Sequence, residues 1–336
     1  MSEVSPVVDD AQIQRAVDFL RAGELVALPT ETVYGLGADA LNADAVGKIF
    51  AAKGRPADHP VIVHLGDAEA LPVWAASVPK EAIALARAFW PGPLTLILRR
   101  SDEVPDIVTG GQDTVGVRVP NHPVALRLLR AFGSGIAAPS ANRFGRISPT
   151  TAEHVQSELG DKVSLVLDGG ACQVGIESTI LDLSRDTPEI LRPGAISPEA
   201  IANVIGRHPA VRQAAGPAPG VPRVSGALEA HYAPRTPLRI VQPPRLRDVL
   251  NMQRHSGARC AVIAHTQPAL AGEPYAWWML PAEPAGYAHD LYAALRAADT
   301  SGAALIVLEA PPTDAAWLAV NDRLRRAVAG AGHPAA

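Results

Sequence analysis

The sequence predicts an α/β protein with two domains joined by a linker. Short apolar runs typical of strands alternate with segments of helical periodicity along the 336 residues. A stretch rich in proline, glycine and alanine separates residues 1–206 from residues 238–336, so residues 207–237 are predicted to be a linker. Two domains also suit a chain of this length, because single domains usually have about 100–200 residues.

Apolar runs and turn residues define the elements expected before the linker. Residues 25–28 predict a strand, and residues 29–37, with the sequence PTETVYGLG, predict a loop. Residues 43–52 predict a helix that ends before Gly54 and Pro56. Further strands are expected at 60–65, 94–98, 114–119, 136–139, 165–167 and 178–183. Further helices are expected at 80–89, 124–132 and 151–159, and from the cap at Ser197 onward.

Strands and helices also alternate after the linker. Strands are expected at 238–241, 260–264 and 304–309, and helices at 245–254, 285–298 and 314–329. Regular alternation of this kind is typical of a parallel sheet. Residues 238–336 are therefore predicted to form a small Rossmann-like parallel α/β domain.

The composition excludes several classes of protein. Hydrophobic residues make up 48% of the chain and charged residues 19%, which is enough apolar material for two cores and is not typical of disorder. The net charge is −4, whereas a protein that mainly grips a nucleic-acid backbone is usually basic. Any nucleic-acid contact is therefore expected to be local or made through partners.

The cysteines and the apolar runs predict the cellular setting. Cys172 and Cys260 form no CxxC motif, so neither a zinc site nor a disulfide scaffold is expected. The polar, acidic N-terminus does not resemble a signal peptide. The longest apolar runs are far shorter than the roughly 20 residues that a membrane helix needs. We expect a cytoplasmic protein without a membrane association.

One expected strand, residues 114–119, combines a core face with a polar face. Its valines alternate, which leaves Thr114, Gly116 and Arg118 on the opposite face. A glycine between a hydroxyl and a guanidinium leaves room for a ligand against the sheet. The alternative is a half-exposed strand with a surface arginine, which is the commoner arrangement for such a strand taken alone.

Two cations follow the helix at 43–52. Lys53 and Arg55 are candidates for binding an anion, and the alternative is that they only stabilise the helix dipole. His59 and His64 lie nearby in sequence, although a lone histidine is more often structural than a ligand.

A short strand at 136–139 leads into another group of polar residues. Ala138, Ser140 and Asn142 have the same parity, so their side chains face one way if the chain stays extended; the alternative is an ordinary loop. Ser148 precedes a helix, where a hydroxyl is the expected cap. Ser178 opens a strand, and Arg192 is expected at a turn.

Together these residues predict a site for an anionic substrate such as a nucleoside triphosphate. The chain has no GxxxxGK[ST] motif, no GxGxxG motif that opens a helix, no HExxH and no GxSxG. A nucleotide would therefore be held by side chains from scattered elements, mostly at strand ends, where open α/β sheets bind ligands. The candidates are the cations Lys53, Arg55, Arg118 and Arg192 and the hydroxyls of Thr32, Thr114, Ser140, Ser148 and Ser178.

Nine segments resemble, in this order, the threonylcarbamoyl-AMP synthase family, which is built on the YrdC-type domain. They are PTETVYGLG, KGRP, HPVIVHL, WPGPLTLIL, TVGVRVP, APSAN, ISPT, ESTI and LRPGAI, within residues 11–206. The HYAP motif at 231–234 and the second α/β domain resemble the long form of the family. The resemblance implies that residues 1–206 form a twisted mixed sheet with a deep basic cavity. The linker 207–237 is long enough to cover this cavity as a lid.

The resemblance also implies an activity. Family members are nucleotidyltransferases that condense L-threonine, bicarbonate and ATP into L-threonylcarbamoyladenylate and release pyrophosphate. Partner threonylcarbamoyl-transferase proteins then modify adenosine 37 of tRNAs that read ANN codons, so tRNA takes part indirectly. Mg²⁺ is expected with the ATP phosphates, and no zinc, no prosthetic group and no dedicated metal ligands are expected.

The same resemblance assigns site residues. Lys53, Arg55, Ser140 and Asn142 match the residues that line the catalytic cavity. The threonine-binding positions match Thr32, His64, Arg118, Ala138 and Ser178. The ATP-binding positions match Arg55, His59, Thr114, Ser140, Ser148, Arg192 and Tyr232.

Two alternative functions remain open at this stage. One is an RNA-binding, translation-associated protein without catalysis, against which the acidic balance argues. The other is a carbamoyl-transfer maturation factor, but proteins of that kind are longer and carry zinc-finger-like cysteine motifs. The second domain is structural, or it binds an effector or a partner.

Overall fold

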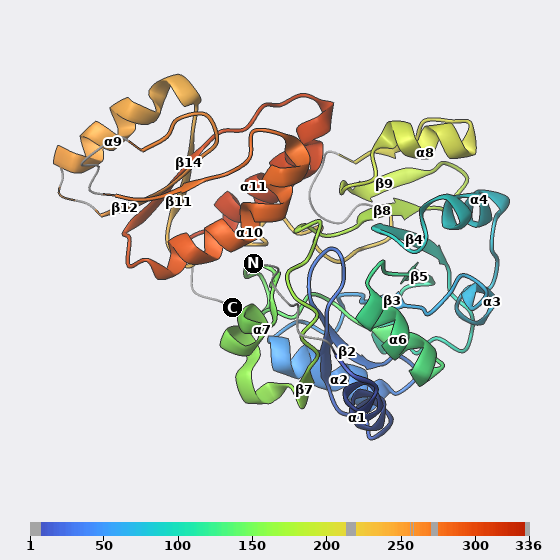
Figure 1. Ribbon diagram of the computed structural model, residues 1–336. Coiled ribbons are helices and arrows are strands. Elements are labelled where there is room, and N and C mark those ends of the chain that lie inside the picture. The colour runs from blue at the N-terminus through green and yellow to red at the C-terminus, as the bar shows by residue number, and fades with distance from the viewer. Residues whose placement is uncertain (1–7, 213–219, 256, 258, 270–274, 333–336) are drawn as a thin grey trace. The chain divides into compact units, whose positions relative to one another are not determined.

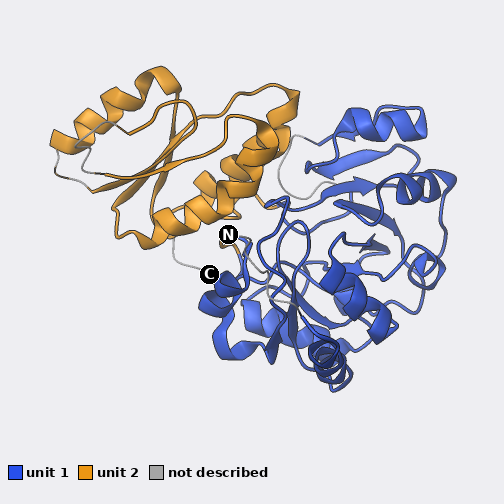
Figure 2. Ribbon diagram, viewed as in Figure 1, with its two compact units in different colours: residues 1–144, 148–227 blue, residues 145–147, 228–336 orange. Residues whose placement is uncertain are grey.

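The computed structural model describes residues 8–212, 220–255, 257, 259–269 and 275–332. Figure 2 shows its two compact units: unit 1 contains residues 1–144 and 148–227, and unit 2 contains residues 145–147 and 228–336. Unit 1 is built on a mixed sheet and unit 2 on a parallel sheet (Figure 1). The predicted fold class is thus confirmed. Within the described residues, no helix has the length and apolar character needed to span a membrane.

The sheet of unit 1 has the strand order β10-β9-β8-β4-β5-β3-β6-β2-β1-β7. At its centre, β5 pairs in parallel with β3 and antiparallel with β4, while β4 pairs in parallel with β8. The strands are β1 (Val26–Leu28), β2 (Gly35–Asp39), β3 (Ile62–His64), β4 (Leu94–Arg99), β5 (Thr114–Arg118), β6 (Ile136–Ala137), β7 (Leu165–Val166), β8 (Thr179–Asp182), β9 (Glu189–Arg192) and β10 (Ala210–Val211).

Local sequence signals begin and end the helices of unit 1. The helix α2 starts after Asn42, whose side chain caps it, and ends at Gly54, which has the left-handed φ of 62° that glycine tolerates best. The helices are α1 (Asp10–Arg21), α2 (Ala43–Lys53), α3 (Leu71–Trp74), α4 (Lys80–Phe89), α5 (Asp106–Thr109), α6 (Pro123–Phe132), α7 (Ala152–Leu159), α8 (Pro198–Ile205) and the 3₁₀ turn η1 (Gly160–Lys162).

Seven of these elements were not expected from the sequence: α1, α3, α5, η1, β2, β9 and β10, the last of which lies within the predicted linker. The helix α1 begins with a capping box at Asp9 and Gln12 in a segment to which the sequence assigned no structure. The strands β2 and β9 occupy segments expected as a loop and a turn. The pairing of β2 with β1 and β6 overrides its low strand propensity, and Gly37 fits because a methyl group there would lie 2.9 Å from Ile136.

The two faces of the unit 1 sheet are covered differently. Along β1, Val26 and Leu28 pack with the helices α1 and α6, while Ala27 joins the larger core that includes α2. At the centre of the sheet, Val63 and Val117 also point into this larger core. Strand alternation therefore leaves the opposite face of β3, β4, β5 and β8 for other contacts.

The parallel sheet of unit 2 has the order β11-β14-β12-β13. At the carboxyl ends of its strands, the buried carboxylate of Glu309 accepts hydrogen bonds from the backbone N–H groups of His265 (2.7 Å) and Thr266 (2.9 Å). The elements are β11 (Leu238–Val241), η2 (Pro243–Arg245), α9 (Leu246–His255), β12 (Cys260–Ala264), β13 (Ala276–Met279), α10 (Pro284–Thr300), β14 (Leu305–Glu309), η3 (Ala315–Trp317) and α11 (Leu318–Gly330).

Unit 2 includes a short piece of chain from within the sequence of unit 1. The backbone N–H of Ala233 donates a hydrogen bond to the carbonyl of Gly145 (2.9 Å), and Arg296 donates one to the carbonyl of Ile147. These bonds hold residues 145–147 in unit 2, although the chain on both sides of them belongs to unit 1.

Candidate functional site

The candidate site lies at the centre of the unit 1 sheet, on the face opposite the larger core that includes α2. Gly116 is at its centre, paired in register with Ile62 on β3 and Ile97 on β4. A methyl group on Gly116 would lie 3.1 Å from Ile97 Cδ1, so the glycine keeps the surface over β5 low. Thr114 and Arg118, on the same face, are buried.

Arg118 is held on three sides. Its Nη1 donates to Thr32 Oγ1 (3.0 Å), its Nε donates to the carbonyl of Gly92 (3.2 Å), and its Nη2 lies 2.7 Å from Glu31 Oε2 in an ion pair. Only 4% of Arg118 is exposed, so the surface-arginine alternative is wrong. The loop 29–34 is thereby fixed against the end of β5.

His64 is the register partner of Arg118 on the neighbouring strand β3. Burial, and then the positive charge of Arg118, lowers the pKa of His64 to about 3. The imidazole is therefore neutral at physiological pH, and it offers a hydrogen-bonding group without a second positive charge.

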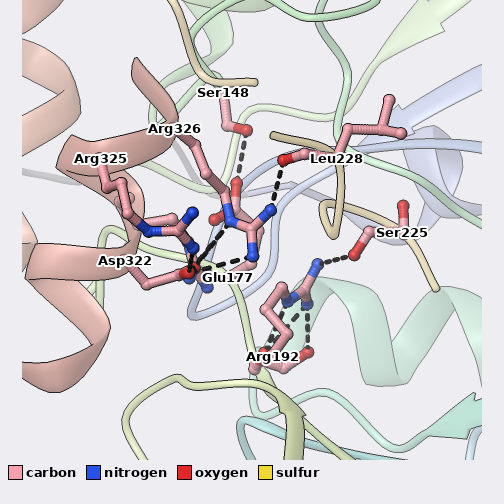
Figure 3. A network of polar contacts seen from close by, with 10 residues as sticks. Ser148, Glu177, Arg192, Ser225, Leu228, Asp322, Arg325 and Arg326 are labelled. Carbon is pink, nitrogen blue, oxygen red and sulfur yellow. Dashed lines mark hydrogen bonds and ion pairs between the residues drawn. The ribbon is translucent and has the colours of Figure 1, made fainter. Parts of the chain in front are cut away.

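Ser178 joins three strands of the site. Its Oγ lies 2.8 Å from Thr95 Oγ1, and Arg192 Nη2 donates to the same Oγ (3.0 Å) and to the Ser178 carbonyl (3.0 Å). Arg192 was expected in a turn, but it is the last residue of β9. It also donates to the carbonyl of Ser225 (2.9 Å), as Figure 3 shows. Sequence analysis missed Thr95, although it is the lone hydroxyl in the otherwise apolar run Leu94–Leu98 of β4.

Ser148 lies in the same unit and is fully buried. Its Oγ donates to Glu177 Oε1 at 2.5 Å (Figure 3). Glu177 directly precedes Ser178 in the sequence. Ser148 does not cap α7; that role belongs to Thr151, whose hydroxyl accepts a hydrogen bond from the backbone N–H of His154. The buried Ser148 hydroxyl is thus connected to the start of β8.

Lys53 is 3% exposed, so a role that is limited to the surface end of a helix does not describe it. Its Nζ donates to the backbone carbonyls of Ser140 (2.6 Å) and Asn142. Burial, and then the nearby charge of Arg55, lowers the pKa of Lys53 well below its ordinary value. Lys53 therefore contacts the backbone of the 140–142 segment.

Arg55 and His59 form the next part of the site. Arg55 Nη2 donates to the carbonyl of Pro60 (2.7 Å) and to Ser225 Oγ (3.4 Å), and its guanidinium carbon lies 5.8 Å from the centre of the Phe144 ring. The His59 ring meets Phe144 edge-on at 5.4 Å. Burial, and then the charge of Arg55, lowers the pKa of His59.

Residues 221–227, from the predicted linker, cover this face of the sheet. Val224 is buried against Ile97, Ile180 and Leu191. A cavity of only about 10 Å³ remains between this segment and the strands. The polar groups of Ser225 are bonded to both Arg55 and Arg192, so the chain itself occupies the donors expected to bind an anion.

The remaining expected residues are placed as follows. Ala138 is buried, and its N–H donates to the carbonyl of Ile62 (2.9 Å) beside the site. Tyr232 belongs to unit 2, where it is buried with its ring stacked on Tyr292 (5.8 Å between centres) and below the guanidinium of Arg323. Residues 213–219 of the expected linker lie outside the described part of the chain.

The fold and the site define a two-unit α/β protein with a buried set of cations and hydroxyls on one sheet face. This donor set suits a small anionic substrate, because arginine forks and hydroxyls match carboxylate and phosphate oxygens.

Comparisons with known proteins agree with this class. Residues 18–194 match the Sua5, YciO and YrdC family, described as telomere recombination, and residues 196–329 match the family described as threonylcarbamoyl-AMP synthase, C-terminal domain. The threonylcarbamoyl-AMP synthase of Pyrococcus abyssi is 42% identical over 329 residues, covering 95% of both chains. That of Bacillus subtilis is 42% identical over 330 residues, covering 96% of this chain and 94% of the relative.

A solved structure extends the likeness to three dimensions. The crystal structure of P. abyssi Sua5 complexed with L-threonine matches with a TM-score of 0.89 and 39% identity, over 97% of this chain and 98% of the other. The chain belongs to the threonylcarbamoyl-AMP synthase family, as the order of its sequence segments predicted.

Proposed function

We propose that this protein is an L-threonylcarbamoyladenylate synthase, a nucleotidyltransferase that condenses L-threonine, bicarbonate and ATP and releases pyrophosphate. The observation that carries the proposal is the convergence of Arg118, Ser178 and Arg192 on one buried sheet face. Full-length relatives named threonylcarbamoyl-AMP synthase support it. So does the Sua5 structure that contains L-threonine.

The threonine subsite is proposed around Arg118. A guanidinium has five N–H donors, and three surrounding groups engage three of them, so two remain for the carboxylate of the substrate. Thr32 and neutral His64 are the neighbours suited to hydrogen bonding with the threonine hydroxyl. Ala138 and Ser178 complete this subsite in the proposal.

The ATP subsite is proposed around Arg55 and Arg192. Both arginines donate to Ser225 in this structure, and phosphate oxygens are suited to replace the serine as acceptors. Lys53 is proposed to place its Nζ donors beside the phosphates, whose negative charge favours the protonated amine. His59, Thr114, Ser140 and Ser148 are proposed as further contacts, together with Asn142 of the catalytic set, while Tyr232 stays a prediction from the sequence resemblance.

The proposed reaction has two steps. The amine of threonine first forms a carbamate with bicarbonate. A carbamate oxygen then attacks the α-phosphorus of ATP, a P–O bond forms, and pyrophosphate leaves with the electron pair of the broken bond. All the reactants carry negative charge, so positioning and cationic side chains provide most of the catalysis.

Mg²⁺ is proposed to enter with ATP. The described residues contain no group of three or more histidine, cysteine or acidic side chains arranged to hold a metal ion. Mg²⁺ at nucleotide sites usually takes its ligands from phosphates and water with one or two carboxylates. Its contribution would be to neutralise phosphate charge.

Residues 207–237 are proposed to act as a lid. The packing of Val224 on the sheet and the bonds of Ser225 to Arg55 and Arg192 support this role. An adenylate is easily hydrolysed, so a segment that excludes water protects it until transfer. Cytoplasmic partner proteins are proposed to pass the threonylcarbamoyl group to adenosine 37 of tRNA, so that tRNA takes part indirectly.

The direct test incubates the pure protein with ATP, Mg²⁺, bicarbonate and single amino acids, and measures pyrophosphate. The proposal expects release that requires both bicarbonate and threonine. An ATP-independent, salt-sensitive shift of RNA without any turnover would instead support the RNA-binding alternative.

The lid is tested separately. Val224→Asp places a charge against Ile97 and Ile180 and is expected to shorten the lifetime of the adenylate while threonine-dependent turnover persists. A chain truncated before Ala214 is expected to show the same loss. Unchanged product lifetime in both proteins would rule out the lid.

A further inference from the structure

Glu31 is a buried carboxylate to which neither the sequence analysis nor the comparisons assign a role. It lies between β1 and β2, and only 3% of it is exposed. Its Oε2 forms the ion pair with Arg118, at 2.7 Å. Its Oε1 has no hydrogen-bond donor among the described residues. A buried carboxylate oxygen without a hydrogen-bond donor raises the free energy of the protein. A ligand with a positive charge or an N–H group would remove this cost by binding to it.

The pair of Arg118 and Glu31 has the charge pattern of an amino-acid receptor. An α-amino acid carries a carboxylate and an ammonium on the same carbon. Arg118 is fixed by Gly92 and Thr32 and keeps N–H groups for the carboxylate. Glu31, in contact with the same guanidinium, is the acidic neighbour suited to the ammonium.

We propose that Glu31 receives the α-ammonium of the amino-acid substrate and takes one of its protons, which produces the nucleophilic amine. This inference rests on the proposed function, because it concerns the carbamate-forming step. Only the unprotonated amine has the lone pair needed to attack bicarbonate. A buried site favours this transfer, since two opposite charges become two neutral groups.

The step balances. One proton passes from the ammonium to the Glu31 carboxylate, and the amine lone pair forms a bond to the carbon of bicarbonate. The carbon–hydroxyl bond breaks, and the hydroxide leaves as water with the second proton of the amine. The products are the carbamate, water and protonated Glu31, which returns its proton to solvent before the next cycle.

The titratable groups that face Glu31 should not change protonation in the pH range used to test it. Burial lowers the pKa of His122 below its ordinary range. Burial raises the pKa of Cys172 to about 12, and the pKa of His64, which faces Arg118, is about 3. None of the three titrates between about pH 7 and pH 10. Lys53 lies with a different part of the site, and its titration is common to wild type and variant.

The test compares the wild type with Glu31→Gln, which keeps the shape and removes the base. At neutral pH we expect kcat for pyrophosphate release to fall ~100-fold or more and the KM for threonine to rise, with the KM for ATP unchanged. The ratio of wild-type kcat to variant kcat should fall about tenfold per pH unit up to the pKa of the threonine amine. At higher pH more threonine enters the site from solution as the free amine, which needs no base.

Two outcomes would overturn the proposal. A kcat ratio that stays constant across this pH range would mean that Glu31 only holds Arg118 in place. Unchanged kinetics would mean that Glu31 has no role. Failure of the proposed function itself is distinct, because the wild-type protein would then show no threonine-dependent pyrophosphate.

Two further variants separate chemistry from folding. Asp182→Asn removes another buried carboxylate, which forms an ion pair with Arg185 (2.6 Å) at the end of β8 away from Ser178. This variant should keep the wild-type pH profile. Glu31→Asp keeps the charge with a shorter reach and should restore part of the activity of Glu31→Gln at neutral pH. Equal losses in both Glu31 variants, with a flat pH ratio, would count against proton transfer.

Discussion

Acidification should destabilise unit 1 through His64. The pKa of this buried imidazole is about 3 in the folded protein, against an ordinary value of 6.5. Because the folded value is the lower one, the stabilisation is complete above pH 6.5, decreases as the pH falls, and is lost by about pH 3. The slope is about 1.4 kcal/mol per pH unit, and the whole interval amounts to about 5 kcal/mol in the free energy of unfolding.

The assay is urea unfolding of the wild type and of His64→Gln at several pH values between about 8 and 4.5. Other groups titrate in both proteins, so the difference between the two free energies isolates His64. The difference should be constant above about pH 7.5, which provides an internal reference. Below pH 6.5 the wild type should lose about 1.4 kcal/mol more per pH unit than the variant. Parallel curves for the two proteins would refute a buried neutral His64.

Three other changes test the site and unit 2. Lys53→Ala should reduce pyrophosphate release by ~10²–10³, because a preorganised cationic donor is lost, and near-normal turnover would remove Lys53 from the mechanism. Gly194→Ala should impair both nucleotide and threonine binding in calorimetry, since a methyl group there overlaps the backbone nitrogen of Thr179; normal affinities would contradict this. Glu309→Ala should cost about 1–3 kcal/mol for each of the backbone N–H groups it leaves unpaired, measured as a lower urea midpoint for unit 2, and an unshifted midpoint would contradict that role.

Much of the fold and of the site follows from local sequence patterns. The alternation in residues 114–118 correctly assigned Thr114, Gly116 and Arg118 to one face, because strand periodicity depends only on the backbone. The alternation of expected strands and helices after residue 238 correctly predicted a parallel sheet, although β13 (Ala276–Met279), which pairs with β12, was not expected. These features need no knowledge of distant neighbours.

The features that were missed depend on pairing between distant parts of the chain. Glu31 has an ordinary loop sequence, and only its partner Arg118, from a strand far along the chain, makes it part of a site. Ser225 was predicted to belong only to the linker, because its bonds to Arg55 and Arg192 join segments that are far apart in the sequence. The glycines of β2 disfavour a strand locally, and the pairing with β1 overrides them.

The three residues 145–147 give the protein an unusual covalent connection. They are held in unit 2, yet Phe144 before them donates its N–H to the carbonyl of Lys53 (2.8 Å), and Ser148 after them bonds to Glu177. The main chain therefore passes between the units at three places: before residue 145, after residue 147 and after residue 227. A cut or an insertion within residues 145–147 is expected to disturb the bond of Phe144 to Lys53 and that of Ser148 to Glu177, both within unit 1.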